Sequence, residues 1–95
     1  MSEGTLYGLL TPLIFHWGAV NGLSMISGRY QRNGWRAVRP LFLLPQHLAG
    51  LALMLLAMLC FVIGTRNGAG WLFVAGSAFM VADVGCIFSA VRRAS

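Results

Sequence analysis

The stretch that decides the fold is residues 41–64, which read LFLLPQHLAGLALMLLAMLCFVIG. It carries no charged residue, and a helix of this length, rising about 1.5 Å per residue, crosses a hydrocarbon core of about 30 Å. Two further apolar segments flank it, over about residues 4–27 and 71–91. The pattern predicts an all-α integral membrane protein whose three transmembrane helices form one up-down-up bundle, a single domain over residues 1–95.

The composition agrees with a membrane protein and excludes several functions. Hydrophobic residues make up 58% of the chain and charged residues only 9%, against about 25% charged residues in soluble domains. The connections are too short for a separate soluble domain, and the chain has no nucleophile, metal or phosphate motif. We therefore expect no enzyme activity and no metal site. The net charge of +5 does not predict nucleic-acid binding, because the arginines flank apolar spans, where anionic lipids attract them.

The arginines also predict the orientation in the membrane. Four lie in the loop of residues 28–40 and two follow the third span, whereas Arg66 alone lies in the second connection. By the positive-inside tendency, the N-terminus is outside and the C-terminus is cytoplasmic. We expect a multi-pass protein of a bacterial inner membrane, either cytoplasmic or intracytoplasmic. The expected contacts with lipid head groups come from Arg29, Arg32, Arg36, Arg39, Arg92 and Arg93.

The start of the second span is ambiguous because of Pro45. Proline has no backbone donor and clashes with the preceding turn, so the helix either kinks at Pro45 or begins there. If it begins at Pro45, residues 41–44 are an interfacial segment and His47 moves toward the head groups. The next connection, residues 65–70, contains the dipeptide Asn67-Gly68, a turn signal.

Small residues form one stripe along each predicted helix, when residues are placed at about 100° steps. Small side chains let helices approach closely in lipid, so each stripe is a candidate packing seam. Cys60 and Cys86 have no metal or redox spacing and are expected to be small packing residues. The central candidates for helix packing are Gly18, Gly22, Gly50, Ala57, Ala78 and Ala82.

Three ionisable residues fall inside the predicted spans, and such residues are functional candidates because charge is costly in lipid. His16 and Asp83 each lie about 18 Å from the outer ends of their spans, and His47 lies about 21 Å from the outside. This common level permits a His-His-Asp cluster that relays protons or binds a ligand. Their angular positions argue against a cluster, since each lies about 110° from the small stripe of its own helix. Of the other intramembrane polar residues, Asn21 is expected to bond across helices, and Gln46 to accompany His47 near the head groups.

Four functions are compatible with these features. The first is a non-catalytic accessory subunit of a larger energy-transducing complex, respiratory or photosynthetic (reaction-centre or light-harvesting type). It would act by packing against other transmembrane subunits, fixing stoichiometry or shaping a quinone path. The second is a cofactor-binding module in which His16 and His47 ligate haem, or either one a chlorophyll-type pigment. The third is a small oligomeric proton or solute transporter that uses Asp83, and the fourth, a membrane-embedded enzyme, lacks a recognisable nucleophile and base.

Overall fold

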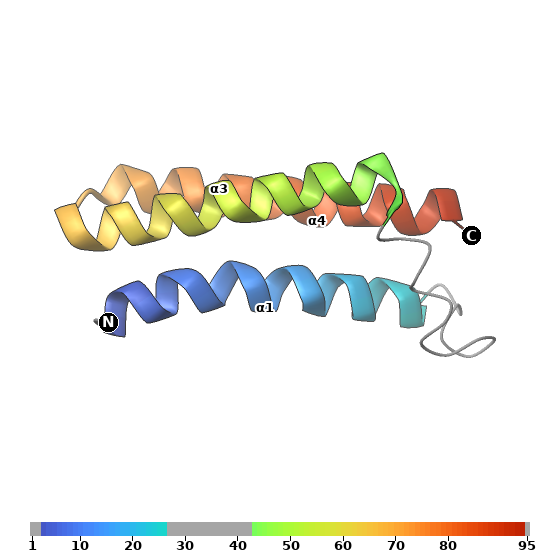
Figure 1. The fold of residues 1–95 in the computed structure, drawn as a ribbon, viewed down its shortest axis with the longest axis horizontal. Coiled ribbons are helices and arrows are strands. Elements are labelled where there is room, and N and C mark those ends of the chain that lie inside the picture. The colour runs from blue at the N-terminus through green and yellow to red at the C-terminus, as the bar shows by residue number, and fades with distance from the viewer. Residues whose placement is uncertain (1–2, 27–42, 95) are drawn as a thin grey trace.

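The computed structural model describes residues 3–26 and 43–94 of the chain. This part of the chain folds into three helices, α1 (Glu3–Ile26), α3 (Pro45–Asn67) and α4 (Gly70–Ala94), which lie side by side in an elongated bundle (Figure 1). The loop that carries Arg29, Arg32, Arg36 and Arg39 lies outside the described residues. Arg92 and Arg93 are exposed in the last turn of α4.

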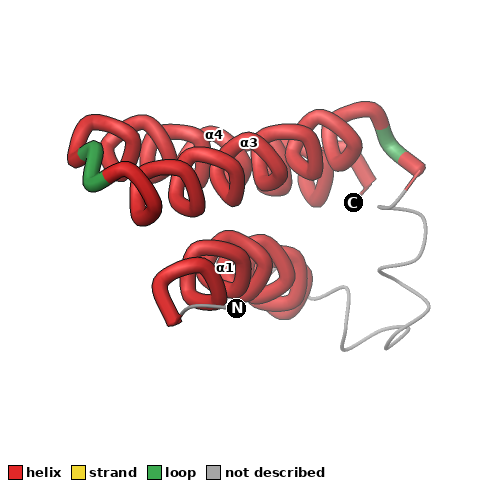
Figure 2. Tube along the Cα trace, turned by 60° about the vertical axis from the view of Figure 1, so that its left-hand side comes forward, coloured by secondary structure: helices red, strands yellow, loops and turns green. Residues whose placement is uncertain are grey.

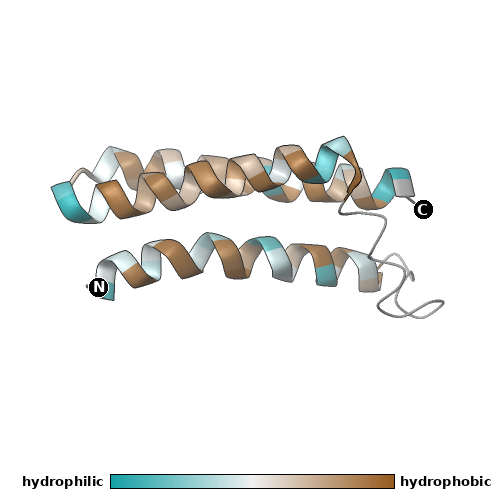
Figure 3. Ribbon diagram, in the orientation of Figure 1, coloured by the Kyte–Doolittle hydropathy of each residue, from teal (hydrophilic) through white to brown (hydrophobic). Residues whose placement is uncertain are grey.

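All three helices are long and apolar enough to span a membrane, which confirms the predicted all-helical membrane architecture. They contain 24, 23 and 25 residues, and 20 residues suffice for about 30 Å. Hydrophobic residues extend along most of each helix, with hydrophilic residues at the ends and in single turns between (Figure 3). Most large apolar side chains, including Ile14, Phe15, Leu55 and Val81, point outward rather than into the bundle.

Helix α3 begins at Pro45 and not at Leu41. Leu44 has extended backbone angles (φ −72°, ψ 141°) and precedes the proline as the N-cap. The Leu44 carbonyl accepts hydrogen bonds from the main-chain N–H groups of His47 and Leu48, both at 3.1 Å. Proline suits the first helical position because its missing N–H has no helical partner there.

The turn between α3 and α4 forms at the predicted Asn67-Gly68 signal. Gly68 adopts a left-handed conformation (φ 65°) and ends α3, a conformation that glycine adopts without steric cost. The N–H of Ala69 donates to the Gly64 carbonyl at 3.1 Å. This short connection places α4 directly beside α3 (Figure 2), and these two helices share the most extensive contact in the bundle.

Helix α1 packs against both other helices along a line of every fourth residue. Because four steps of about 100° exceed a full turn by about 40°, this line winds around α1 and departs from the predicted glycine stripe. Side chains built on Gly18 and Gly22 would meet no atom within 4 Å, so the contacts between helices of this chain do not include these two glycines. The buried residues of α1 are Gly8, Pro12, His16, Val20 and Ser24.

The inward face of α4 also differs from its predicted stripe. Ala78 and Ala82 are exposed, whereas Asp83 is buried. One residue corresponds to about 100° around a helix, so turning Asp83 inward carries Ala82 outward. On α3, Gly50 and Ala57 are buried in the helix interface. Cys60 and Cys86 are half-buried free thiols.

An apolar cluster closes the end of the bundle where α1 and α4 finish. Val20 of α1 packs there with Ile87, Ala90 and Val91 of α4, all at most 4% exposed. Leu44, at the start of α3, lies against the same cluster. The polar residues described next therefore have apolar packing on one side of them along the helix axes.

Candidate functional site

Three ionisable side chains, one from each helix, meet inside the bundle. His16 of α1, His47 of α3 and Asp83 of α4 are 0%, 2% and 1% exposed. The objection from their angular positions is wrong, because the helices are rotated so that these residues, and not the small stripes, face one another. The direct contacts of His16 with Asp83 and His47 confirm that the three side chains lie at one level along the helix axes.

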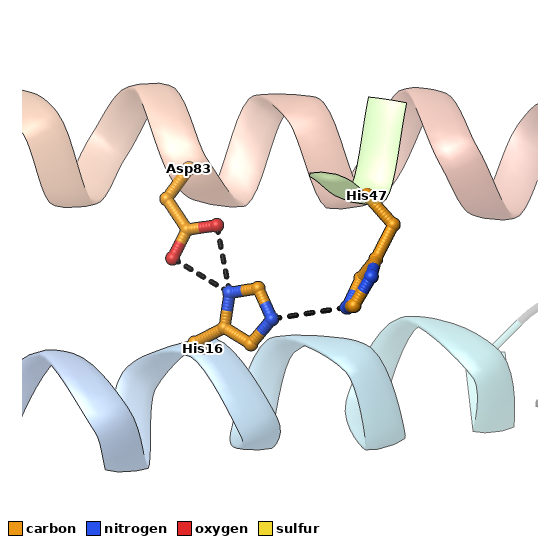
Figure 4. Close-up of polar contacts among 3 residues, drawn as sticks. All are labelled: His16, His47 and Asp83. Carbon is orange, nitrogen blue, oxygen red and sulfur yellow. Dashed lines mark hydrogen bonds and ion pairs between the residues drawn. The ribbon is translucent and has the colours of Figure 1, made fainter. Parts of the chain in front are cut away.

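The three side chains form one hydrogen-bonded chain (Figure 4). Nδ1 of His16 lies 2.8 Å and 2.9 Å from the two carboxylate oxygens of Asp83. Nε2 of the same ring lies 3.1 Å from Nε2 of His47. His16 is thus the central member, and both of its ring nitrogens are engaged. We call Asp83, His16 and His47 the polar chain.

His47 keeps its place in the polar chain although α3 begins at Pro45. It is buried and bonded to His16, and its expected position near the head groups stays a prediction. His47 belongs to the first turn of α3, and its ring reaches His16 with a centroid separation of 5.0 Å. Trp17 adds an edge-on contact to the His16 ring, with centroids 5.5 Å apart at 88°.

Gly50 provides the space that Asp83 occupies. A Cβ atom at position 50 would lie 2.7 Å from Oδ1 of Asp83, the same oxygen that contacts His16, and 3.5 Å from the Asp83 main-chain oxygen. Real Cβ contacts are almost never this short. Asp83 is therefore held between the backbone of α3 and the imidazole of α1, and Gly50 is a positioning residue for it.

The other intramembrane polar residues lie outside the polar chain. Nδ2 of Asn21 donates to the main-chain carbonyl of Trp17 at 3.0 Å, within its own helix, and the bond across helices expected for Asn21 stays a prediction. Gln46 is half-buried beside His47 on α3, and its side-chain oxygen has no hydrogen-bond partner among the described residues.

The observed geometry of the polar chain is not that of a haem held between His16 and His47, and pigment ligation by His47 alone stays a prediction. An iron held between two imidazoles at about 2.0 Å each needs ligand nitrogens about 4 Å apart, and the two Nε2 atoms are 3.1 Å apart. His16 has no nitrogen left for a pigment, since both bind other side chains. Within residues 3–26 and 43–94, no group of three histidine, cysteine or acidic side chains is arranged to hold a metal ion.

The sequence pattern does not single out Pro12, and it predicts only a packing role for Gly50. Pro12 is buried one turn before His16, and a proline inside a helix could have drawn attention to this face. Gly50 was expected only as a packing residue, because its contact with Asp83 depends on how α3 and α4 are rotated.

Scans against family models, curated proteins and solved structures found no match to this chain.

Proposed function

We propose that this protein carries protons within the membrane along the polar chain. The single observation behind this function is the unbroken series of hydrogen bonds through three titratable side chains, all nearly inaccessible to solvent. Ionisable groups inside a membrane are costly and commonly mark proton relays. An imidazole between a carboxylate and a second imidazole can accept a proton at one nitrogen and release one from the other.

The three members can share one mobile proton without a change in net charge. When Asp83 holds the proton, its hydroxyl donates to Nδ1 of His16, and Nε2–H of His16 donates to His47. When His16 holds it, the imidazolium donates from both nitrogens to the Asp83 carboxylate and to His47. When His47 holds it, its Nε2–H donates to His16, whose Nδ1–H still donates to Asp83. All three forms are neutral overall, which suits a low-dielectric interior.

Each transfer breaks one bond to hydrogen and forms one. The O–H bond of Asp83 breaks as Nδ1–H forms on His16, and Nε2–H of His16 breaks as Nε2–H forms on His47. His16 then carries hydrogen on Nδ1, so its tautomer must be restored before a second proton follows. The relay therefore moves one proton each time His16 returns to the tautomer with hydrogen on Nε2.

The polar chain extends along the helix axes. In Figure 4, Asp83 lies toward the N-terminal end of α1 and His47 toward its C-terminal end. With the three helices crossing the membrane up-down-up and the N-terminus outside, Asp83 faces the outer side and His47 the cytoplasmic side. The exposed Arg92 and Arg93 at the end of α4 support this orientation.

A second proposed function is that of a non-catalytic accessory subunit in a larger energy-transducing complex of a bacterial inner membrane. The specific observation in its favour is a cavity of about 430 Å³ on the surface of the bundle, where α1 and α4 meet. Its lining residues are Ile14, Phe15, Gly18, Ala19 and Val84. Gly18 and the exposed apolar residues around it are suited to packing against another transmembrane subunit. The two functions are compatible, because a relay can serve a larger assembly.

Proton flux into liposomes tests the relay. Purified protein is reconstituted with a trapped pH-sensitive dye, and a potassium gradient with valinomycin drives the flux. Asp83→Asn retains the shape of the side chain but cannot accept and release the proton. His47→Gln retains a hydrogen-bond donor to His16, but its amide cannot accept and release the proton either. We expect both variants to conduct no faster than liposomes without protein, while Ser89→Ala, on the exposed face of α4, conducts like the wild type.

Equal flux in Asp83→Asn and wild type would contradict the relay. Wild-type protein that raises the flux no higher than empty liposomes would contradict it as an activity of the isolated chain. Gentle extraction followed by native gels tests the second function separately, since an accessory subunit migrates with partner subunits and an independent protein does not.

A further inference from the structure

A cavity separate from the polar chain lies at the end of the bundle where α1 begins and α3 turns into α4. Its volume is about 280 Å³, and its lining comes from all three helices. We call it the end cavity. The lining residues are Gly4, Tyr7, Gly8, Thr11, Phe61, Thr65 and Phe73.

The floor and the rim of the end cavity differ in chemistry. Gly8 is buried and Phe61 half-buried, so these two form the floor, whereas Tyr7, Thr11 and Thr65 are exposed at the rim. The Phe61 and Phe73 rings have centroids 6.0 Å apart at 33°, which offers aromatic surface to a flat ligand. The described lining holds no charged side chain, which favours a neutral ligand.

Pro12 removes one main-chain hydrogen bond of α1 next to this floor. A proline inside a helix has no N–H for the carbonyl four residues earlier, and for Pro12 that carbonyl belongs to Gly8. In a membrane, a neighbouring helix, a hydroxyl, a water or a local change of the helix satisfies such a carbonyl. The threonine hydroxyls at the rim can donate as well as accept.

From these features we propose that the end cavity binds a neutral amphiphile with one aromatic ring and a ring hydroxyl, of the phenol or hydroquinone class. The ring lies against Phe61 and Phe73, and its hydroxyl forms hydrogen bonds with the hydroxyl of Thr11 or Thr65 at the rim. The volume fits one ring, because a cavity of about 150 Å³ already accepts benzene. The tail extends past Tyr7 into the bilayer, from which the ligand enters.

The test uses full-length protein in lipid nanodiscs and two probes, 4-hexylphenol and hexylbenzene. Amide NMR signals of Gly4, Gly8 and Thr65 report on the cavity, and those of Gly22 and Gly85, where a Cβ would meet nothing within 4 Å, report on general membrane effects. We expect saturable shifts confined to the cavity signals with 4-hexylphenol, and at least about fivefold weaker binding of hexylbenzene, the value of one hydrogen bond of about 1 kcal/mol.

Variants separate hydrogen bonding from partitioning into the bilayer. The double variant Thr11→Val and Thr65→Val retains side-chain volume and should weaken 4-hexylphenol about fivefold, with no effect on hexylbenzene. Ser89→Ala removes a hydroxyl elsewhere and should change neither. Equal binding of the two probes, shifts spread over all glycines, or an unaltered affinity in the double variant would overturn the proposal. None of these outcomes depends on the proton flux, so the proposed relay stands or falls independently.

Discussion

The polar chain and the apolar cluster are both buried and both join α1 to α4, yet they hold the bundle in different ways. Val20 and Ile87, at 1% exposure each, exchange contact with lipid tails for contact with each other. Since lipid tails are as apolar as these side chains, that exchange gains little beyond good packing. The bonds from His16 to Asp83 and His47 have no equivalent in lipid. The polar chain therefore specifies how the helices are rotated, and the apolar cluster fills the space that this rotation leaves.

The largest expected effect comes from Gly50→Ala. The added methyl group meets Oδ1 of Asp83 at 2.7 Å, so either α3 moves away from α4 or the carboxylate leaves His16. Overpacking of this kind lowers the free energy of unfolding by about 1–3 kcal/mol. Because the hydrogen bond between Asp83 and His16 is lost as well, we expect a loss of about 3 kcal/mol. Steric trapping in bicelles measures the free energy of unfolding. A change below about 0.5 kcal/mol would show that Asp83 does not depend on Gly50.

Asp83→Leu should follow, with a loss of about 2 kcal/mol. The substitution leaves Nδ1 of His16 buried without its carboxylate partner, and an unsatisfied buried polar group costs about 1–3 kcal/mol. The same steric-trapping measurement applies, with Asp83→Asn as the matched control because an amide can still accept from His16. If leucine and asparagine were equally stable, the polar chain would contribute nothing to the choice of helix rotation.

Ile87→Val in the apolar cluster should cost less, about 0.5–1 kcal/mol. It removes one methylene from a side chain that is 1% exposed, and such truncations cost about 0.5–1.5 kcal/mol in soluble proteins. Lipid can cover part of the gap, so we expect the lower half of that range. A loss above that of Asp83→Leu would reverse the comparison and make packing the dominant determinant.

Gly22→Ala should have the smallest effect, and of opposite sign. A Cβ there meets no atom within 4 Å, and alanine is favoured over glycine inside a helix by about 0.5–1 kcal/mol. We expect unchanged or slightly higher stability in bicelles. A clear loss accompanied by dissociation on native gels would instead show that Gly22 packs against another chain.

The spans and one turn were predictable because they depend on local sequence. Apolar stretches long enough for a bilayer predict helices, and Asn67-Gly68 predicts the left-handed residue that ends α3. The common level of His16, His47 and Asp83 along the helix axes was also predictable, since the rise per residue of a helix is constant. The rotation of each helix was not, because small residues and polar residues on different faces competed for the interior.

By itself, the sequence determined that the chain is an all-helical membrane protein and that three ionisable side chains lie near one level. Only the tertiary structure decided that α3 begins at Pro45 while His47 still reaches His16. The tertiary structure also opposed Gly50 to Asp83 and turned Gly18 and Gly22 outward. The physical reason is that length and hydropathy are properties of one helix, whereas hydrogen bonds between helices depend on the rotation of all three together.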